Sequence, residues 1–553
     1  MFSFSMKKLV CLCILLVTSV FVLGACRRGE DEPIDFAALV GGEGIFAIPR
    51  DTVGEITVMM WAGSGEFLRD VGRNYIPQED IWGMNDAAII AVARVFNRYF
   101  PYITINANTV TGGHGYIWDQ HRDNFRLEFG HWPDVFAVAD LVSDVQRGHV
   151  ADLSIFRDDP MFQAFNPMIM QMMELGGRQF AIPEYVLPQG VFVNHSLAER
   201  ENIDVPHHTW NFDEFVRFQM HSRANDFYGT VGAPFRMVDS GTRDVLWSLV
   251  DPNRGPNDPF VNLNSEAVRN IISQLPQVLD HGIWAQSALG NIDAAFMDTH
   301  WWWGARFFSQ GVLLSHAHEA YMLAAMVNPA DGMYVLAENW DYFPLPSTPY
   351  VGNHVTLILD PMGIRNFAMD DGNPILSPSE YAQLAIAWEF SKFFAGDTRA
   401  WEARANQHFN LGDGNFRNAM SPSFPFVTGQ AFYDQMDIWF DTIGARFRDP
   451  VRTPGFHYVM DLLLRGEFPA WTYKTTPWWH EFEGSPRRIM HEWINMWNAA
   501  YAGASDLEPH WVDMLFARLP EWDVEINQRF ADAFAHLYGQ IALFYPEQVR
   551  GGR

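Results

Sequence analysis

Cysteine and lysine are both scarce in this chain of 553 residues. The three cysteines, Cys11, Cys13 and Cys26, lie close together at the N-terminal end, so no disulfide can form within the rest of the chain. Lysine occurs only at positions 7, 8, 392 and 474. Chemistry that depends on a lysine amine therefore has few candidate residues, and nearly all basic side chains are arginines.

Basic charge is low as well. The chain has 38 Lys and Arg against 66 Asp and Glu, which gives a formal net charge of -28. A nucleic-acid backbone needs a basic surface that displaces its counterions, so this composition excludes nucleic-acid binding. The sequence also lacks a Gly-x-x-x-x-Gly-Lys-Ser/Thr loop, a dinucleotide-binding loop and a nucleophile elbow. The chain is therefore not itself an ATPase.

The composition that remains is that of a folded, aromatic-rich protein. Hydrophobic residues make up 48% of the chain and aromatic residues 15%, with 21 Trp among them. These proportions argue against disorder. The length allows about three to four average domains, or two large lobes with ample core.

The N-terminal end has the features of an export signal. Lys7 and Lys8 precede an apolar run over 9–25 that ends in Leu-Gly-Ala before Cys26. A positive start, an apolar centre and small residues at the end are typical of a cleaved signal peptide, which predicts a signal over 1–25. Retention of the run as a membrane anchor ahead of Arg27 and Arg28 is the alternative. Leu-Gly-Ala-Cys resembles a bacterial lipobox, which implies lipidation of Cys26 and a polar tether over 26–52.

Hydrophobic periodicity predicts an α/β fold in the region after the tether. Apolar, β-prone runs at 56–61, 102–107 and 135–139 read as strands, and 86–100 reads as a helix whose apolar residues share one side. Strand, helix and strand at this spacing indicate βαβ units and a largely parallel sheet.

Farther along, 181–194 reads as an extended segment. Ser377, Pro378 and Glu380 have the pattern of a helix start with a capping box. The segment 478–537 is mostly helical in pattern, and we expect interruptions at Gly503, Pro509 and Pro520.

Several blocks of this chain, in order, resemble the family 1 extracellular solute-binding proteins, the substrate-binding lipoproteins of ABC transporters, of the carbohydrate type. The blocks are 180–183 (Phe-Ala-Ile-Pro), 191–195 (Val-Phe-Val-Asn-His), 203–206 (Ile-Asp-Val-Pro), 209–215 (Thr-Trp-Asn-Phe-Asp-Glu-Phe), 293–297 (Asp-Ala-Ala-Phe-Met), 343–346 (Phe-Pro-Leu-Pro) and 387–390 (Ala-Trp-Glu-Phe). Each block is short, but their order covers nearly the whole exported body.

The resemblance implies a two-lobed periplasmic-binding-protein fold of type II, in which each lobe is a mixed, mainly parallel sheet flanked by helices. Lobe 1 is expected at 53–185 with 363–468, and lobe 2 at 188–360 with 472–545. Crossings between the lobes are expected near 183–190, 361–363 and 469–476. The resemblance further implies a monomer without cofactor that delivers a small-molecule solute, a sugar or oligosaccharide, to ABC transporter permease subunits. No metal site is expected, because the histidines at 207–208 and 316–318 lack a helical i, i+4 pair.

Aromatic residues are the main candidates for holding such a solute, because flat rings suit the apolar faces of sugars. Trp61 ends the first predicted strand beside a Gly-rich loop, where ligands bind in α/β sheets. Trp302 and Trp479 match the family's aromatic cleft positions, and Tyr185 lies in the first crossing. Glu66 follows the first strand and could bind hydroxyl groups. Any single Trp is more often a core residue than a ligand contact.

Other interpretations stay open at the level of sequence. Glu184 in the crossing and Asp134 before a strand are further polar candidates, although an exposed acid is more often simply solvated. Asn211 and Glu214 fit a helix cap better than a site. A surface glycan-active hydrolase and a glycan adhesin or sensor without transport are the alternative functions, since carboxylate pairs are abundant and sequence spacing says nothing about their separation.

Overall fold

The computed structural model describes a large part of the chain, in several stretches. These are residues 48–61, 63–110, 116–230, 264–279, 281–282, 292–296, 305–327, 339–348, 352–369, 374–412, 414–420, 423–468, 475 and 511–546. The predicted signal peptide, Cys26, Trp302 and Trp479 lie outside the described residues, as does most of the predicted tether and third crossing.

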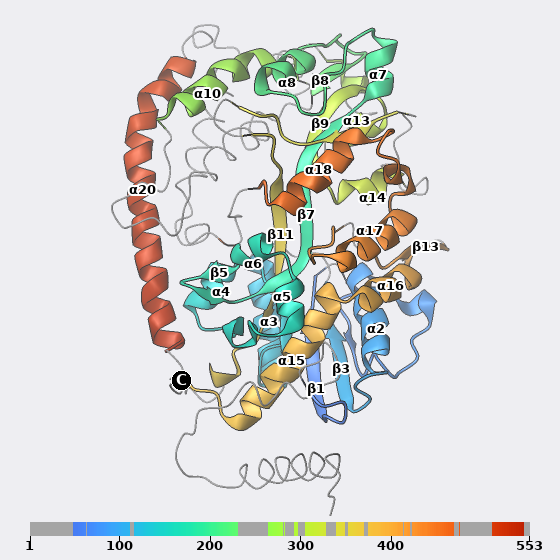
Figure 1. Cartoon of the computed structure of the whole chain (residues 1–553), viewed down its shortest axis with the longest axis vertical. Helices are drawn as coiled ribbons and strands as arrows, with labels where there is room; N and C mark the ends of the chain where they lie inside the picture. Colours follow the sequence, from blue (N-terminus) through green and yellow to red (C-terminus); the bar gives the residue numbers. More distant parts are fainter. Residues whose placement is uncertain are drawn as a thin grey trace, which may run out of the picture.

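One nine-stranded mixed sheet runs through the described part of the molecule (Figure 1), and its strands follow the order β2-β3-β1-β4-β11-β7-β9-β8 with β10 paired to β7. One end of the sheet holds β1 (Gly54–Met59), β2 (Phe67–Leu68), β3 (Ile103–Asn108) and β4 (Val135–Ala137). The other holds β8 (Tyr228–Thr230), β9 (Leu313–Glu319) and β10 (Asp341–Phe343). We call the part built on β1–β4 lobe 1 and the part built on β8–β10 lobe 2.

The two lobes share the long strands β7 (Ile182–Val193) and β11 (Thr356–Ile364), which lie antiparallel from Ile182 opposite Met362 to Gln189 opposite Thr356. β11 continues the sheet to β4 of lobe 1, whereas β7 pairs with β9 and β10 of lobe 2. Every residue of β7 is buried. The extended conformation predicted for this segment is therefore confirmed, and the two strands carry the sheet from one lobe to the other.

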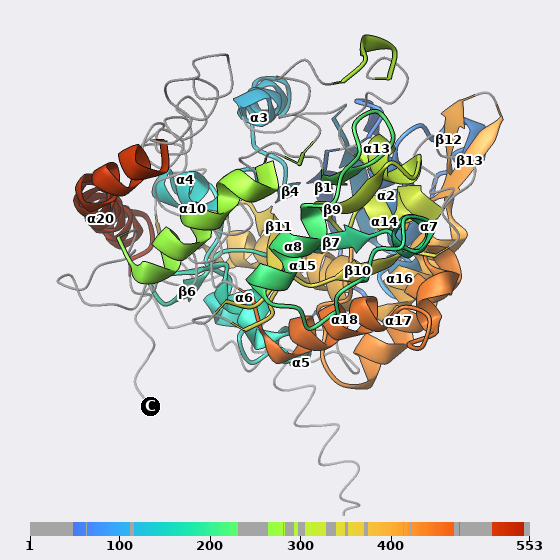
Figure 2. The ribbon, with the colours of Figure 1, turned by 90° about the horizontal axis from the view of Figure 1, so that it is seen from above.

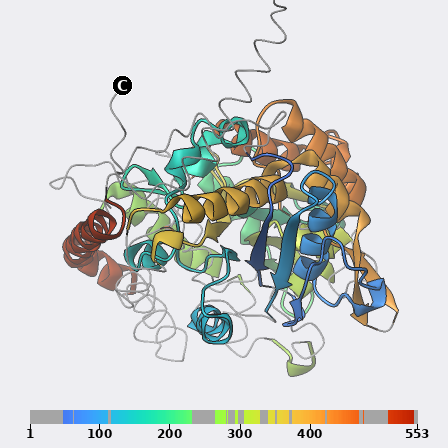
Figure 3. The ribbon, with the colours of Figure 1, turned by 90° about the horizontal axis from the view of Figure 1, so that it is seen from below.

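Helices cover the sheet in both lobes. In lobe 1, α15 (Pro378–Gly396) lies against β1, β7 and β11, and α16 (Thr398–Asn406) packs on α2 (Met84–Phe96) (Figure 3). In lobe 2, α8 (Phe212–Gln219) packs on β8 and β9, and α13 (Ala305–Ser309) packs on β9. The other described elements are α3 (Tyr116–Phe129), α4 (Leu141–Gln146), α5 (Pro160–Ala164), α6 (Pro167–Gln171), α7 (His195–Arg200), α10 (Glu266–Leu279), α14 (Met322–Val327), α17 (Gln430–Thr442), α18 (Pro454–Arg465), α20 (Trp511–Phe544), the short 3-10 helices η2 (Gln78–Asp80), η3 (Leu153–Phe156), η4 (Phe367–Met369) and η5 (Ala445–Arg448), and the hairpins β5–β6 (Glu174–Leu175, Arg178–Gln179) and β12–β13 (His408–Gly412, Asn415–Asn418).

Local sequence signals placed several of these elements correctly. The strands expected near 56, 102 and 135 are β1, β3 and β4, and the expected helix is α2. Both predicted capping boxes are confirmed: Ser377 with Glu380 begins α15, and Asn211 with Glu214 begins α8. The side chain of each cap residue accepts a bond from the N3 backbone, and the N3 carboxylate accepts one from the cap backbone.

The expected interruption at Pro520 is wrong, because α20 continues through this residue for 34 residues in all. The predicted lobe boundaries stay a prediction, and two helices bear on them. α18 packs against β10 of lobe 2, and α20 contacts α10 of lobe 2 as well as α4 of lobe 1.

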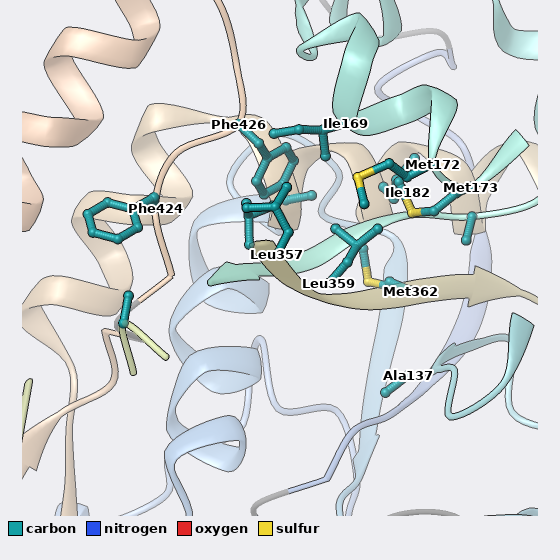
Figure 4. Close-up of a cluster of buried hydrophobic side chains, with 14 of the residues drawn as sticks. Ala137, Ile169, Met172, Met173, Ile182, Leu357, Leu359, Met362, Phe424 and Phe426 are labelled. Atoms are coloured by element: carbon teal, nitrogen blue, oxygen red, sulfur yellow. The ribbon is translucent and has the colours of Figure 1, made fainter. Parts of the chain in front are cut away.

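A dense apolar core encloses the shared strands (Figure 4). Leu359 and Met362 of β11 are fully buried beside Met172 and Met173, which follow α6, and Phe426 lies on the same side. The segment just before Phe426 also bonds to the backbone of β7, since Phe424 N donates to Val186 O at 2.9 Å. Val186 N also donates to Ser423 Oγ at 2.8 Å, so both backbone polar groups of this β7 residue are bonded on the edge away from β11.

The described part of the chain contains one lysine, Lys392 of α15, and it is buried with two carboxylates. Its Nζ lies 2.6 Å from Asp159 Oδ2 and 3.0 Å from Glu389 Oε2, and each of the three side chains is at most 5% exposed. Asp159 also caps α5 and accepts a bond from Trp388 Nε1 at 3.1 Å. This cluster fastens α15 to the chain before α5.

We predict that Lys392→Met strongly destabilises the protein. The substitution leaves two carboxylates buried without their cation, and breaking a buried pair in this way costs about 3–5 kcal/mol. Urea unfolding followed by circular dichroism measures the effect. Arg465→Met, which removes the exposed ion pair with Asp461, is the control and should cost less than about 0.5 kcal/mol. A loss for Lys392→Met as small as that of the control would contradict the prediction.

Candidate functional site

The candidate site lies at the C-terminal end of β1, the sheet edge at which α/β proteins bind ligands. The chain leaves β1 through Trp61 and a loop that is closely packed. Gly63 N donates to Val110 O at 3.1 Å, and a Cβ at Gly63 would lie 2.1 Å from Thr109. A Cβ at Gly83, which precedes α2, would lie 2.3 Å from the Cα of Gly63. The two glycines therefore allow the start of α2 to approach the end of β1.

Asn85, in the first turn of α2, connects this loop to the shared strand β7. Its Nδ2 donates to Trp61 O at 2.6 Å and lies 3.4 Å from Glu184 Oε1, and its Oδ1 accepts a hydrogen bond from the Tyr185 hydroxyl. Asn85 is fully buried. A single amide thus fixes the end of β1 relative to two consecutive residues of the crossing strand.

Asp86, the next residue of α2, holds the loop itself. Its carboxylate accepts a bond from Ser64 N at 2.6 Å and another from the Thr109 hydroxyl. Burial raises the pKa of Asp86, and the nearby charge of Glu66 raises it further. Glu66 is exposed, with its backbone N 3.2 Å from Ser64 Oγ, so this predicted site residue lies at the outer margin of the buried cluster.

Several charged side chains are buried near Tyr185. Glu184 is 2% exposed, and Asp360 of β11 lies opposite Tyr185 in the strand pairing. Arg404 of α16 is buried there too, where it donates to the carbonyl of Phe394 at 3.2 Å. Burial lowers the pKa of Arg404 to about 10, while the charges of Tyr185 and Glu184 act in the opposite direction. Burial, and next the charge of Glu184, raises the pKa of Tyr185 well above its ordinary value.

The structure brings together Trp61 and Tyr185 and places Glu66 at their margin. Trp61 and Tyr185 are each 5% exposed, so both rings are largely covered in this state of the protein. Asp134 has a structural role: it accepts bonds from Thr57 N at 2.8 Å and Arg365 Nη2 at 2.9 Å, and so ties β4 to β1 and to the end of β11.

Sequence reasoning missed Asn85, Asp86 and Arg404. A signal existed for the first two, because a polar pair opens a helix that is otherwise almost entirely apolar. Arg404 carries no such signal, since arginines on helices are mostly exposed. The cluster joins carboxylate, amide and phenol groups to the backbone of a tryptophan, and these are types of group that bind hydroxyls and the apolar faces of rings.

Among the described residues, no group of three or more His, Cys, Asp or Glu side chains could hold a metal ion. None of the helices in the described stretches combines the length and the apolar composition that a membrane span requires.

We predict that Asn85 and Tyr185 are energetically coupled. Asn85→Ala and Tyr185→Phe each remove the same hydrogen bond, so the double variant should lose less stability than the two single variants together. The expected coupling is about 0.5–3 kcal/mol. Urea unfolding of the four proteins measures it. The matched control pairs Tyr185→Phe with Asn97→Ala. Asn97 caps the C-terminal end of α2, its amide donates to Phe100 O and Ile103 O, and the two changes should be additive. Additivity of the Asn85 pair would contradict the geometry.

Neither a protein-family model nor a curated protein matches the sequence. Solved structures do match over most of the chain, at low sequence identity. An ABC substrate-binding protein from Listeria monocytogenes in complex with cycloalternan is 13% identical, with a TM-score of 0.51, and the match covers 85% of this chain and 99% of that one. A sugar transporter from Rhizobium etli in an open conformation is 14% identical, with a TM-score of 0.53, and the match covers 85% of this chain and 98% of that one.

The third structure, the cyclic α-maltosyl-1,6-maltose binding protein from Arthrobacter globiformis, is 16% identical, with a TM-score of 0.52, and the match covers 87% of this chain and 100% of that one. Likeness at this level of identity concerns the fold. The mixed sheet, its two lobes and the strands that join them agree with these structures, and the expected fold class is confirmed. The chain has the two-lobed fold of the solute-binding proteins of ABC transporters.

Proposed function

We propose that this protein is a lipid-anchored extracellular solute-binding protein that captures a sugar or oligosaccharide between its lobes and delivers it to the permease of an ABC importer. The observation that carries the proposal is the junction at the end of β1, where Asn85 joins Trp61 to Glu184 and Tyr185 of the strand that both lobes share. A solute bound at this junction would contact the element through which the lobes move relative to each other.

The chemistry of the junction favours a carbohydrate. An indole ring offers an apolar face, and buried carboxylate and phenol groups can bind hydroxyls. The similar proteins from Listeria monocytogenes and Arthrobacter globiformis are named for cyclic oligosaccharides, and the one from Rhizobium etli is named a sugar transporter. Trp302 and Trp479 belong to the proposal as further aromatic contacts, on the family resemblance alone.

Import requires partners that this chain does not supply. The sequence has no phosphate-binding loop, so the energy for transport would come from a separate ATPase through the permease subunits. Closure of two lobes on a solute is an established transition of binding proteins with this fold, and the closed form would be the one that the permease recognises.

Binding of a carbohydrate to the purified protein is the direct test of solute capture. We expect isothermal titration calorimetry against cycloalternan, cyclic maltosyl-maltose, maltose and ribitol to show saturable binding of at least one of them. Trp61→Ala should weaken that binding by at least about 2- to 13-fold, because a stacked aromatic contributes about 0.5–1.5 kcal/mol beyond its buried area. Tyr102→Ala, an exposed aromatic at the opposite end of β3, is the control and should bind as the wild type does.

Other outcomes would assign a different function. Release of reducing ends from a polysaccharide, abolished by a single carboxylate substitution, would make the protein a hydrolase. Carbohydrate binding together with unchanged sugar uptake in a deletion strain would make it an adhesin or sensor. If Trp61→Ala bound the carbohydrate with unchanged affinity but was less stable, Trp61 would be a core residue and not a ligand contact.

The lipid anchor is tested by Cys26→Ser. The serine hydroxyl cannot form the thioether on which lipidation depends, and two or more acyl signals are needed for stable attachment. We expect the variant to move from the membrane pellet to the soluble fraction in an immunoblot of fractionated cells. Membrane association that persists in the variant would indicate an uncleaved N-terminal anchor over 9–25.

A further inference from the structure

The C-terminal helix α20 extends along both lobes (Figures 1 and 2). It has 34 residues, which corresponds to a length of about 51 Å. Its first part contacts α10, which packs on α8 of lobe 2, and its last part contacts α4 of lobe 1. One buried face continues from end to end, through Leu515, Leu519, Trp522, Ile526, Phe530, Phe534, Leu537 and Ile541. The helix is therefore packed against the molecule along its whole length.

The contact with lobe 2 depends on a proline. Pro520 has no N–H, so the carbonyl of Phe516, four residues earlier, cannot receive its normal bond within the helix. Arg269 of α10 supplies the missing donor: its Nη2 lies 3.3 Å from Phe516 O, and its guanidinium lies 4.9 Å from the centre of the Phe516 ring. Asn264 Oδ1 accepts from Arg269 Nε at 3.1 Å and orients the guanidinium. The position at which the helix loses its own bond is thus the position at which lobe 2 holds it.

The contact with lobe 1 is tighter and more apolar. The Tyr545 hydroxyl donates to Val150 O at 2.7 Å, and its ring meets Phe180 edge-on at 4.8 Å. Gly148, at φ +73°, leaves room for Phe544, which would lie 3.0 Å from a Cβ at this position. Val150 is bridged to Arg365, directly after β11. This end of α20 is therefore anchored next to a shared strand.

These contacts give the lobes a connection besides β7 and β11. A rotation of the lobes about the shared strands changes the distance between α4 and α10, whereas a long helix keeps its length. The helix must then limit the rotation or detach at one end. Besides its buried apolar residues Leu515 and Leu519, the lobe 2 end has the Arg269 bond, which is partly exposed, whereas the polar contact of the lobe 1 end, from the Tyr545 hydroxyl to Val150 O, is buried. The lobe 2 contact is therefore the one that water can replace more easily. We propose that α20 is a brace between the lobes, and that the Arg269–Phe516 contact is the latch at which it releases.

The proposal does not depend on which solute the protein captures, and it is tested without solute. Spin labels at Tyr102→Cys in lobe 1 and Glu199→Cys in lobe 2, both exposed, report the distance between the lobes by pulsed electron paramagnetic resonance in a full chain whose three cysteines are replaced by serine. We expect Arg269→Leu to broaden the distance distribution by about 1.5-fold or more, as release of a local contact would. Tyr545→Phe, at the opposite end of the brace, should broaden it in the same direction.

Two further variants separate a brace from a simple helix cap. Pro520→Ala restores the N–H that the Phe516 carbonyl lacks, so it repairs the helix without reconnecting it to α10. In the double variant Arg269→Leu with Pro520→Ala, the distribution should stay broad, while amide hydrogen exchange over 512–520 returns to the wild-type level. Arg529→Leu, which removes an ion pair with Glu525 inside α20, should leave the distribution unchanged. An unchanged distribution in Arg269→Leu, or its recovery in the double variant, would overturn the proposal.

Discussion

The pairing of β7 with β11 is the interaction on which the rest of this structure depends. Sheet hydrogen bonds continue from β4 through β11 and β7 to β9, so each lobe is completed by strands that also belong to the other. Strand pairing has a period of two, and a slip of one residue would turn each side chain to the opposite face. A specific bond across the two strands opposes such a slip, because Thr356 Oγ1 donates to Oε1 of its partner Gln189 at 2.9 Å. The register breaks only between Asp360 and Pro361.

Because the register is fixed, the positions of the site residues follow from it. Tyr185 is held opposite Asp360, and Glu184 and Tyr185 then meet Asn85 from α2. Arg404 of α16 compensates part of the negative charge of Glu184, although burial lowers the pKa of its guanidinium. Acidic groups in this position can stay buried only with such compensation. The residues of the candidate site are therefore held by the core of lobe 1 and by the strand that both lobes share.

Features that depend on neighbours in the chain could be predicted from the sequence, and features that depend on distant contacts could not. The capping boxes at Ser377 and Asn211 involve side chains three residues apart, and the strand β1 is a local apolar run. Arg404 reaches its charged neighbours only through the packing of α16 on α2. Pro520 was predicted to end its helix, because the sequence near a proline does not show contacts with distant elements. In the structure the helix continues, and Arg269 of α10 donates to the Phe516 carbonyl that the proline leaves free.

The molecule thus contains connections of two kinds between its lobes. The shared strands are mostly buried and are joined to each other by sheet pairing over most of their length, so they resist separation but can twist. The helix α20 is a long path whose ends are held by side chains, so it resists a change in distance and can be released one contact at a time. If the lobes open and close as the proposed function requires, α20 would limit a rotation that the shared strands alone would permit. Pro520 is exposed, and the carbonyl that it leaves free belongs to partly buried Phe516, so the bond from Arg269 forms at the margin between the core and the solvent.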